Sequence, residues 1–235
     1  PWLIALAVLA VTLAGIGGFL AARLGGDRAA TERIVRDYLL ENPEIIPEAM
    51  ERLQHKQGAQ RLASIRAEVT APYPGAVLGN PEGSVTLVEF SDFACGYCRS
   101  VVDDIDALIA RDPELRVVLR EWPILSPESA DAARMALAAA EQGKYAPFFH
   151  AMFAAGRPGP DTIAAAARAA GLDMDKARAA IASPRIEQEI ARNMEMAQQL
   201  GFNGTPSWIA GEQLISGAVG ADVLAEALDA ARKPG

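Results

Sequence analysis

The sequence predicts an α/β domain with an inserted helical subdomain, preceded by an N-terminal transmembrane helix and a helical stalk. Three observations support this prediction. The chain opens on a long apolar segment without charge, a β-branched run of strand length is followed at once by two cysteines and a helical pattern, and a long alanine-rich stretch separates this strand from a second set of short strands. A hydrophobic share of 51% with 22% charged residues is typical of a folded chain.

The charge and the metal-ligating residues exclude several classes of protein. The chain has 22 basic and 30 acidic residues, a formal net charge of −8, which argues against nucleic acid as a partner. It has two cysteines and two histidines. This number is too small for a zinc site with four Cys or His ligands or for a scaffold of several disulfides, so we predict no metal site of that kind.

Residues 1–26 are predicted to be a membrane segment. The first charged side chain is Arg23, and the 22 residues before it would form a helix of about 33 Å, enough to cross a hydrocarbon core of about 30 Å. A cleaved signal segment is the alternative, but a cut after Ala22 would put Leu20, which is not small, at the third position back. On either interpretation we expect the rest of the chain to be extracytoplasmic.

Residues 27–69 are predicted to form a helical stalk with nearly balanced charges. Apolar side chains recur at helical spacing, first Ile34, Tyr38 and Leu39, then Ile46, Met50 and Leu53. This narrow apolar face either packs on the main domain or pairs with copies of itself in a homo-oligomer, and we favour the second. Residues 70–84, rich in Pro and Gly, are predicted to be a linker.

The pair Cys95 and Cys98 lies where a strand gives way to a helix. Residues 85–91 have the profile of a buried strand, and apolar residues recur at helical spacing after the cysteines. Unpaired amide groups and the positive dipole end at a helix start stabilise a thiolate, the reactive form of cysteine. We therefore predict a redox-active dithiol without any other cofactor, in which Cys95 attacks a disulfide and Cys98 resolves the mixed disulfide.

Other interpretations of this dithiol are weaker. A zinc knuckle would need a second cysteine pair, haem attachment would need His where Arg99 stands, and a structural bridge over so short a loop would stabilise little. A Cu(I) site on the two soft thiolates remains the alternative from another class of protein.

The rest of the chain predicts further strands and helices. Residues 115–122 are a second strand candidate, and residues 126–200 form a run of helical segments interrupted by Gly and Pro. Residues 207–210 and 213–216 are predicted to form a hairpin, followed by a helix over 221–232. The α/β core therefore comprises residues 85–125 and 201–235, and residues 126–200 form the inserted subdomain.

Several motifs carry a resemblance to a known family. The segment from Glu89 to Cys98, which reads Glu-Phe-Ser-Asp-Phe-Ala-Cys-Gly-Tyr-Cys, resembles the active site of the DsbA-like branch of the thioredoxin-fold oxidoreductases. The stretches 120–125, 129–133, 143–153 and 204–207 also resemble that branch, so that the likeness covers residues 85–232. The resemblance implies a thioredoxin fold with an inserted helical subdomain.

The resemblance also implies roles for individual residues. It makes Pro206 a cis-proline and places Thr205 beside the dithiol, where the two hold the substrate chain, and it assigns Glu89 to a buried carboxylate that relays the proton of Cys98. Gly96 and Tyr97, between the cysteines, are expected to contact the substrate as well.

The direction of the reaction is predicted from the residues between the cysteines. Gly96 and Tyr97 are uncharged, so a less acidic thiol and a bias to disulfide isomerase or reductase are expected, with a DsbA-type net oxidase as the alternative. Gly-Tyr at this place and Thr205 resemble periplasmic disulfide isomerases, and the region around Asn42 resembles the stalk of the oligomeric suppressor-of-copper-sensitivity C proteins. The expected partners are cysteine-containing exported proteins, a membrane redox partner and the membrane itself.

Overall fold

The computed structural model describes residues 2, 11–14 and 28–232. They fall into two compact units, which lie within residues 1–54 and 55–235. The predicted anchor over 1–26 lies outside the described residues except for residues 2 and 11–14. In the part of the chain that is described, no helix has both the length and the apolar character needed to span a bilayer.

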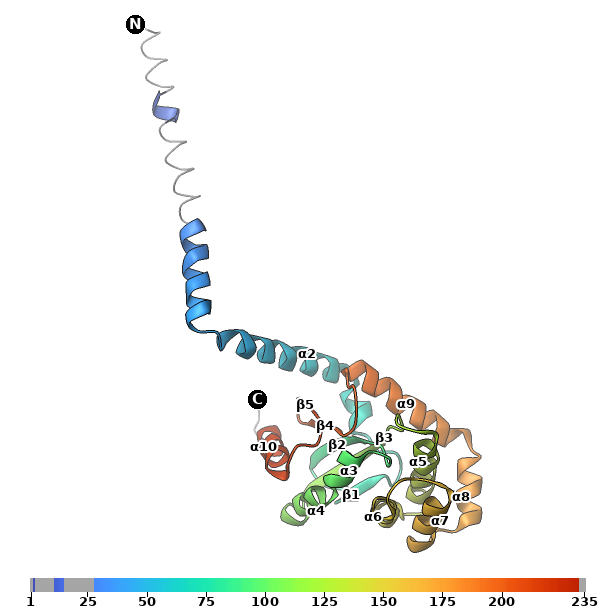
Figure 1. Ribbon diagram of the computed structural model, residues 1–235. Coiled ribbons are helices and arrows are strands. Elements are labelled where there is room, and N and C mark those ends of the chain that lie inside the picture. The colour runs from blue at the N-terminus through green and yellow to red at the C-terminus, as the bar shows by residue number, and fades with distance from the viewer. Residues whose placement is uncertain (1, 3–10, 15–27, 233–235) are drawn as a thin grey trace. The chain divides into compact units, whose positions relative to one another are not determined.

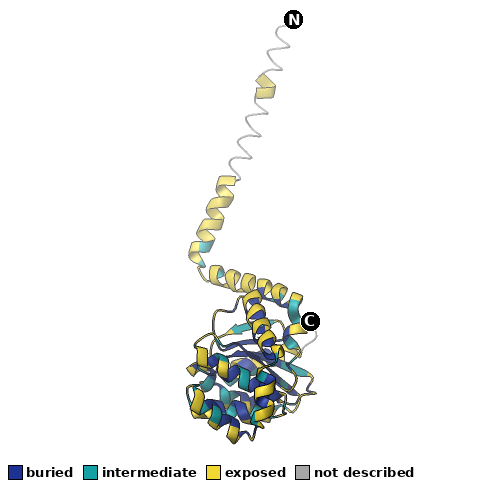
Figure 2. Cartoon of the chain, turned by 90° about the vertical axis from the view of Figure 1, so that its right-hand side faces the viewer, coloured by how far each residue is buried: buried dark blue, intermediate teal, exposed yellow. Residues whose placement is uncertain are grey.

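The described part of the first unit is helical apart from one turn. Residues 28–41 form a helix, and a short turn at 42–44 leads into α2 (Ile45–Thr70), whose first residues belong to this unit. Asn42 Nδ2 donates a hydrogen bond to the carbonyl oxygen of Tyr38 at 2.9 Å, which satisfies an acceptor at the end of the first helix. Most of the described residues of this unit are exposed (Figure 2), among them the large apolar residues Ile34, Tyr38 and Leu40.

The second unit is built on a mixed sheet of five strands in the order β1-β3-β2-β4-β5. The central strand β2 runs parallel to β3 and antiparallel to β4, and the two edge strands β1 and β5 are antiparallel to their neighbours (Figure 1). The strands are β1 (Val77–Gly79), β2 (Val85–Ser91), β3 (Leu115–Glu121), β4 (Ser207–Ala210) and β5 (Gln213–Ser216). This is the α/β arrangement with an inserted set of helices that the sequence predicts.

The helices of the second unit follow the predicted order. They are α3 (Gly96–Ser100), α4 (Val102–Arg111), α5 (Pro127–Ala140), α6 (Tyr145–Ala155), α7 (Pro160–Ala169), α8 (Met174–Ile181), α9 (Pro184–Leu200) and α10 (Ala221–Ala231). Capping residues fix several of their starts. Ser126, Asp173 and Ser183 accept hydrogen bonds from backbone N–H groups in the first turns of α5, α8 and α9.

The sheet has an apolar core on each face. Alternate strand residues such as Leu87, Val117 and Leu119 pack with α4 to α8 and α10 in the larger core, which also holds both cysteines. The other alternation, with Val88 and Phe90, packs against α2 and the end of α9 in the smaller core. The dithiol therefore belongs to the face of the sheet that carries the inserted helices.

Two predicted boundaries differ from the structure. The predicted stalk over 27–69 is divided, because α2 from His55 onward belongs to the second unit and buries Leu62 and Val69 in the smaller core. The predicted linker over 70–84 contains β1, which pairs with β3 and so extends the sheet. A strand of three residues is too short to show the alternation by which strands are recognised in a sequence.

Candidate active site

The dithiol lies at the carboxyl end of the central strand. β2 ends at Ser91, three residues form a turn, and Cys95 is the N-cap of α3 with extended backbone angles (φ −76°, ψ 117°). The N–H of Cys95 donates to the carbonyl oxygen of Asp92 at 2.9 Å, and the carbonyl of Cys95 accepts from the N–H of Arg99 at 3.1 Å. The dithiol therefore lies between a strand and the start of a helix, as the sequence predicts.

Both cysteines are free thiols and both are largely covered by protein. Cys95 Sγ donates a hydrogen bond to the carbonyl oxygen of Thr205 at 3.3 Å, so that the end of the β2 turn is in contact with the segment before β4. The peptide bond between Thr205 and Pro206 is cis, as the resemblance implies. The structure therefore brings Cys95, Cys98 and Thr205 together from segments more than 100 residues apart.

The surroundings of the two sulfurs shift their pKa values in opposite directions, so that Cys95 is an acidic thiol and Cys98 is not. The pKa of Cys95 is lowered to about 5, chiefly because the Cys98 thiol donates a hydrogen bond to its sulfur, although burial opposes the shift. The backbone N–H groups of Cys98 and Tyr97 lower it further. Burial raises the pKa of Cys98 far above its ordinary range, and the hydrogen bond to Cys95 and the charge of Glu89 raise it more.

Glu89 is a buried carboxyl group on the same face of β2 as the larger core. Neither of its carboxylate oxygens has a hydrogen-bond partner among the described residues. Burial raises its pKa to about 8; the nearby Ser91 hydroxyl lowers it, and a negative charge on Cys95 raises it. A carboxyl group with such a pKa can take up or release a proton near neutral pH.

The remaining predicted site residues are Gly96 and Tyr97, which follow Cys95 in α3, and the Thr205–Pro206 pair before β4. The side chain of Tyr97 is 70% exposed, and a side chain at Gly96 would meet none of the described atoms within 4 Å. Pro206 is buried and its carbonyl oxygen accepts from the N–H of Gly217 at 2.9 Å. The hydroxyl of Thr205 is buried and has no partner among the described residues.

Asp92 holds the dithiol turn in place, a role that the sequence analysis does not assign. Its buried carboxylate accepts three backbone N–H bonds, from Ala94 at 2.8 Å and from Ile124 and Leu125 at 2.9 Å each. The bond to Ala94 is the local Asx pattern that a sequence can suggest, but the other two donors lie more than 30 residues away. Asp92 thereby fastens the turn before Cys95 to the loop after β3.

Glu121 is a second buried carboxyl group near the dithiol that the sequence analysis does not identify. It pairs with Ser91 in the parallel register of β2 and β3, and it accepts a hydrogen bond from the Tyr145 hydroxyl at 2.6 Å. Burial raises its pKa to about 8; the bond from Tyr145 lowers it, and the charges of Asp92 and Glu89 raise it. Successive side chains of a strand point to opposite faces of the sheet. Glu121 is two, four and six residues after Leu119, Val117 and Leu115, so the sequence could have placed it on the same buried face as these apolar residues.

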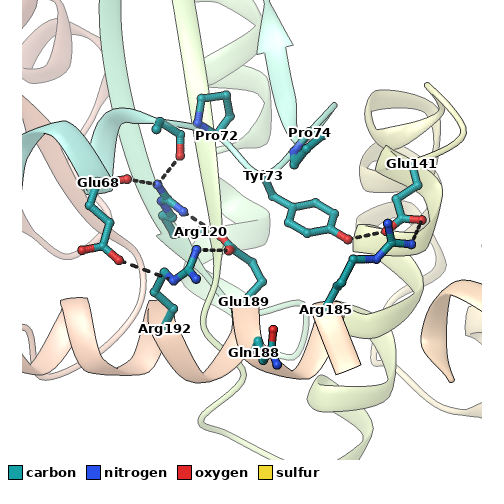
Figure 3. Close-up of a pocket in the computed structure, with 11 residues that line it drawn as sticks. Glu68, Pro72, Tyr73, Pro74, Arg120, Glu141, Arg185, Gln188, Glu189 and Arg192 are labelled. Atoms are coloured by element: carbon teal, nitrogen blue, oxygen red, sulfur yellow. Dashed lines mark hydrogen bonds and ion pairs between the residues drawn. The ribbon is translucent and has the colours of Figure 1, made fainter. Parts of the chain in front are cut away.

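Arg120, one residue earlier, lies on the opposite face of the sheet in a buried polar network (Figure 3). Its guanidinium donates to Glu189 Oε1 at 2.7 Å, to Asn193 Oδ1 at 3.3 Å and to the carbonyl oxygens of Glu68, Val69 and Ala71. The network borders a pocket of about 570 Å³. Since all these donors are used within the chain, the network joins the end of α2, β3 and α9 rather than offering a ligand site.

The described residues contain no group of three or more His, Cys, Asp or Glu side chains arranged to hold a metal ion. The groups that the site offers for chemistry are the acidic thiol of Cys95, the buried thiol of Cys98 and the buried carboxyl group of Glu89.

Fold and site together define a thioredoxin-like thiol:disulfide oxidoreductase domain. The family model described as the DsbA-like thioredoxin domain matches residues 86–229, so the chain belongs to the DsbA-like thioredoxin family. A second family model, the N-terminal domain of the copper resistance protein ScsC, matches residues 27–60.

Solved structures of relatives agree with this assignment. A thioredoxin-like oxidoreductase from Silicibacter pomeroyi DSS-3 is 44% identical with a TM-score of 0.64, covering 68% of this chain and 92% of that one. The thiol-disulfide exchange protein alpha-DsbA2 from Wolbachia pipientis is 28% identical with a TM-score of 0.69, covering 76% of this chain and 97% of that one.

Curated relatives of this chain are much longer proteins. The Na(+)/H(+) antiporter NhaA of Herminiimonas arsenicoxydans is 29% identical over 159 residues, which are 67% of this chain and 25% of the antiporter. The chain thus spans about a quarter of the length of the curated relatives it matches.

Proposed function

We propose that this chain catalyses thiol–disulfide exchange on cysteine-containing exported proteins, with Cys95 as nucleophile and Cys98 as resolving thiol. The observation that carries the proposal is the placement of the two cysteines: Cys95 is the N-cap of α3 and contacts the carbonyl oxygen of Thr205 at 3.3 Å, whereas Cys98 is fully buried. The direction of their pKa shifts agrees with this placement. The pKa of Cys95 is lowered to about 5 and that of Cys98 is raised, so that near neutral pH one sulfur is a thiolate and its neighbour a thiol.

The exchange conserves atoms and electrons through two steps. The Cys95 thiolate attacks one sulfur of a client disulfide, a mixed disulfide forms, and the other client sulfur leaves as a thiolate. Cys98 then loses its proton and attacks Cys95 Sγ, which forms the Cys95–Cys98 disulfide and releases the reduced client. Two electrons pass from the dithiol to the client, and no cofactor besides the dithiol is invoked.

Glu89 is suited to accept the proton of Cys98 in the second step. A negative charge on Cys95 raises the pKa of Glu89, and this charge disappears when Cys95 enters the mixed disulfide. The carboxyl group therefore becomes a stronger acid, and so is more fully ionised, when Cys98 must be deprotonated. Once it is ionised, its buried oxygens, which have no partner among the described residues, are available to accept that proton.

Client binding is assigned to Thr205 and Pro206 with Gly96 and Tyr97. A client chain passing Cys95 would meet the backbone of Thr205, and an extended peptide can pair there as an added strand. The open space over Gly96 and the exposed ring of Tyr97 leave room for client side chains next to the reacting cysteine.

We favour the isomerase or reductase direction because of the uncharged Gly96–Tyr97 pair, and a net oxidase is the second candidate. The lowered pKa of Cys95 supports the net oxidase, because a stable thiolate makes the disulfide form more oxidising. This low pKa also differs from the sequence-based prediction, which expects a less acidic thiol. Equilibration of the dithiol in glutathione buffers decides between them. A potential near about −120 mV supports the oxidase, and one at or below about −180 mV supports the isomerase or reductase.

Activity assays test the exchange itself. Insulin reduction and refolding of a scrambled substrate should be lost in Cys95→Ala, and Cys98→Ala should accumulate a mixed disulfide with the substrate. A wild-type protein that binds Cu(I) tightly but neither reduces insulin nor refolds the scrambled substrate would instead support a copper-handling protein.

We also propose that residues 1–26 anchor the protein to the membrane, with the dithiol domain in the periplasm, where an unidentified membrane redox partner exchanges electrons with it.

We further propose that residues 27–69 mediate homo-oligomerisation. The large apolar side chains exposed on 28–41 and the likeness of 27–60 to the ScsC N-terminal domain support the oligomer. Light scattering should show that the double variant Ile34→Lys, Tyr38→Lys is monomeric. Val223→Lys, at an exposed apolar position of α10, is the matched control. A monomer mass for the wild-type protein would exclude the oligomer, and an oligomer mass that the double variant keeps would exclude these residues as its interface.

A further inference from the structure

Three buried polar groups belong to the face of the sheet that packs in the larger core near the carboxyl end of β2, and two of them have no hydrogen-bond partner among the described residues. The hydroxyl oxygen of Ser91 and both carboxylate oxygens of Glu89 are buried without a partner among the described residues. The third group, the thiol of Cys98, is fully buried. A buried polar atom without a hydrogen-bond partner lowers the stability of the folded state. Two such groups on one strand therefore point to a role in function rather than in stability.

The geometry of β2 places Ser91 on the same face as Glu89, at the end of the strand from which the turn to the dithiol begins. Glu89 and Ser91 are two residues apart on one strand, so both face the larger core that contains Cys98. Ser91 is the last residue of the strand and is 4% exposed, whereas Glu89 lies one step deeper. The Ser91 hydroxyl is near enough to both groups to lower the pKa of each.

We propose that Ser91 relays the proton of Cys98 to Glu89 when the mixed disulfide is resolved. The inference rests on the proposed function and adds a residue to it. As Cys98 Sγ attacks Cys95 Sγ, its proton passes to Ser91 Oγ while the hydroxyl proton of Ser91 passes to the Glu89 carboxylate. The disulfide between Cys95 and the client breaks, the Cys95–Cys98 disulfide forms, the client leaves as a thiolate, and Ser91 ends the step neutral.

A hydroxyl group is well suited to this position. It donates and accepts a hydrogen bond at the same time and can rotate between two partners, which a carboxylate or a thiol alone cannot do. Before the reaction the protonated groups make no strong bond with one another. When Cys98 ionises, the hydroxyl can stabilise the new thiolate, which explains why Ser91 lowers the pKa of Cys98.

The test measures the two chemical steps separately in Ser91→Ala and Ser91→Thr. Reduced protein is mixed rapidly with a peptide disulfide, the reaction is quenched in acid, and the mixed disulfide and the Cys95–Cys98 disulfide are counted by mass spectrometry over a range of pH. In Ser91→Ala we expect resolution to slow by about tenfold or more with a changed pH profile, while attack by Cys95 keeps its rate. Ser91→Thr, which keeps the hydroxyl, should restore resolution.

Two controls separate this role from a structural one. Removing an unpaired buried hydroxyl should leave the unfolding midpoint in urea unchanged or raise it, whereas a structural serine would destabilise the protein and slow both steps when replaced. In the Glu89→Gln background the Ser91→Ala change should have no further effect on resolution, because the relay has lost its acceptor.

The outcomes distinguish the relay from the proposed function. If Ser91→Ala resolves the mixed disulfide at the wild-type rate with the wild-type pH profile, the relay is wrong although the exchange reaction stands. Loss of stability together with slowing of both steps also overturns it. If the wild-type protein forms no mixed disulfide, the proposed function itself fails.

Discussion

The thiol of Cys95 donates a hydrogen bond to the carbonyl oxygen of Thr205 at 3.3 Å. This contact joins the residue proposed to attack a disulfide to the residue proposed to hold the client chain. When Cys95 ionises, the thiol no longer donates, and the carbonyl oxygen of Thr205 becomes free to accept an N–H from a client strand. The contact therefore links the protonation state of Cys95 to the backbone group that is proposed to bind the client.

The low pKa of Cys95 depends on its partner thiol, which gives a first prediction. The hydrogen bond from Cys98 is the largest cause of the shift to about 5, so Cys98→Ala should raise the pKa of Cys95 toward its ordinary value. The thiolate absorbance in the ultraviolet, followed as a function of pH, measures this. Cys95→Ala serves as the control and should show no thiolate in the acidic range; an unchanged midpoint in Cys98→Ala would contradict the assignment.

The same pKa predicts how the stability of the reduced protein depends on pH. A thiol whose folded pKa is about 5 and whose ordinary value is 9.0 stabilises the folded state fully above pH 9, and this contribution is lost as pH falls through about 5. The reduced protein should therefore gain stability relative to the oxidised one as pH rises between these values. Urea unfolding of both forms measures the difference, and the comparison is repeated in Glu89→Gln because the pKa of Glu89 depends on the charge of Cys95.

Much of the sheet and the dithiol position could be predicted from the sequence, because local patterns encode them. The strand Val85–Ser91, the hairpin of Ser207–Ala210 with Gln213–Ser216 and the helix start at Cys95 coincide with β2, β4, β5 and α3. These elements are signalled by residues that are neighbours in the chain, such as β-branched runs and turn glycines.

The features that the sequence did not reveal depend on distant contacts. Asp92 is satisfied by N–H groups of the loop after β3, and Tyr145, which binds Glu121, comes from the inserted subdomain. The division of α2 at His55 likewise follows from packing of Leu62 against the sheet, not from any change in its helical pattern. A single sequence shows which residues are close along the chain. It does not show which distant residues the fold brings into contact, and these pairings are of that second kind.

The buried pair of Arg120 and Glu189 should be costly to break on one side. The two groups are 2.7 Å apart and almost without solvent contact, so Glu189→Gln leaves the guanidinium charge without its counterion. We expect a loss of unfolding free energy of about 3 kcal/mol, measured in urea. Glu187→Gln, at an exposed ion pair on the same helix, is the matched control and should cost less than about 1 kcal/mol.

The Tyr145 hydroxyl is expected to matter for stability rather than for exchange. Tyr145→Phe keeps the ring but removes the donor to Glu121, which leaves a buried carboxyl oxygen without this bond and should cost about 1–3 kcal/mol. Because that bond lowers the pKa of Glu121, its loss should raise the pKa above the present value of about 8. Urea unfolding and carboxyl titration by NMR measure the two effects, and an unchanged rate of attack by Cys95 is expected alongside them.

Two glycines with left-handed backbones provide a matched pair for the last prediction. Gly75 has φ +85°, and a Cβ there would lie 2.3 Å from the carbonyl oxygen of Ala140, whereas Gly143 has φ +68° with open space around it in the described structure. Gly143→Ala should cost only the backbone term, about 1 kcal/mol. Gly75→Ala adds a collision with backbone that cannot move without displacing the end of α5, so we expect a loss of more than about 3 kcal/mol. Urea unfolding of the two variants side by side measures the difference, and equal losses would mean that the segment before β1 does not pack on α5 as described.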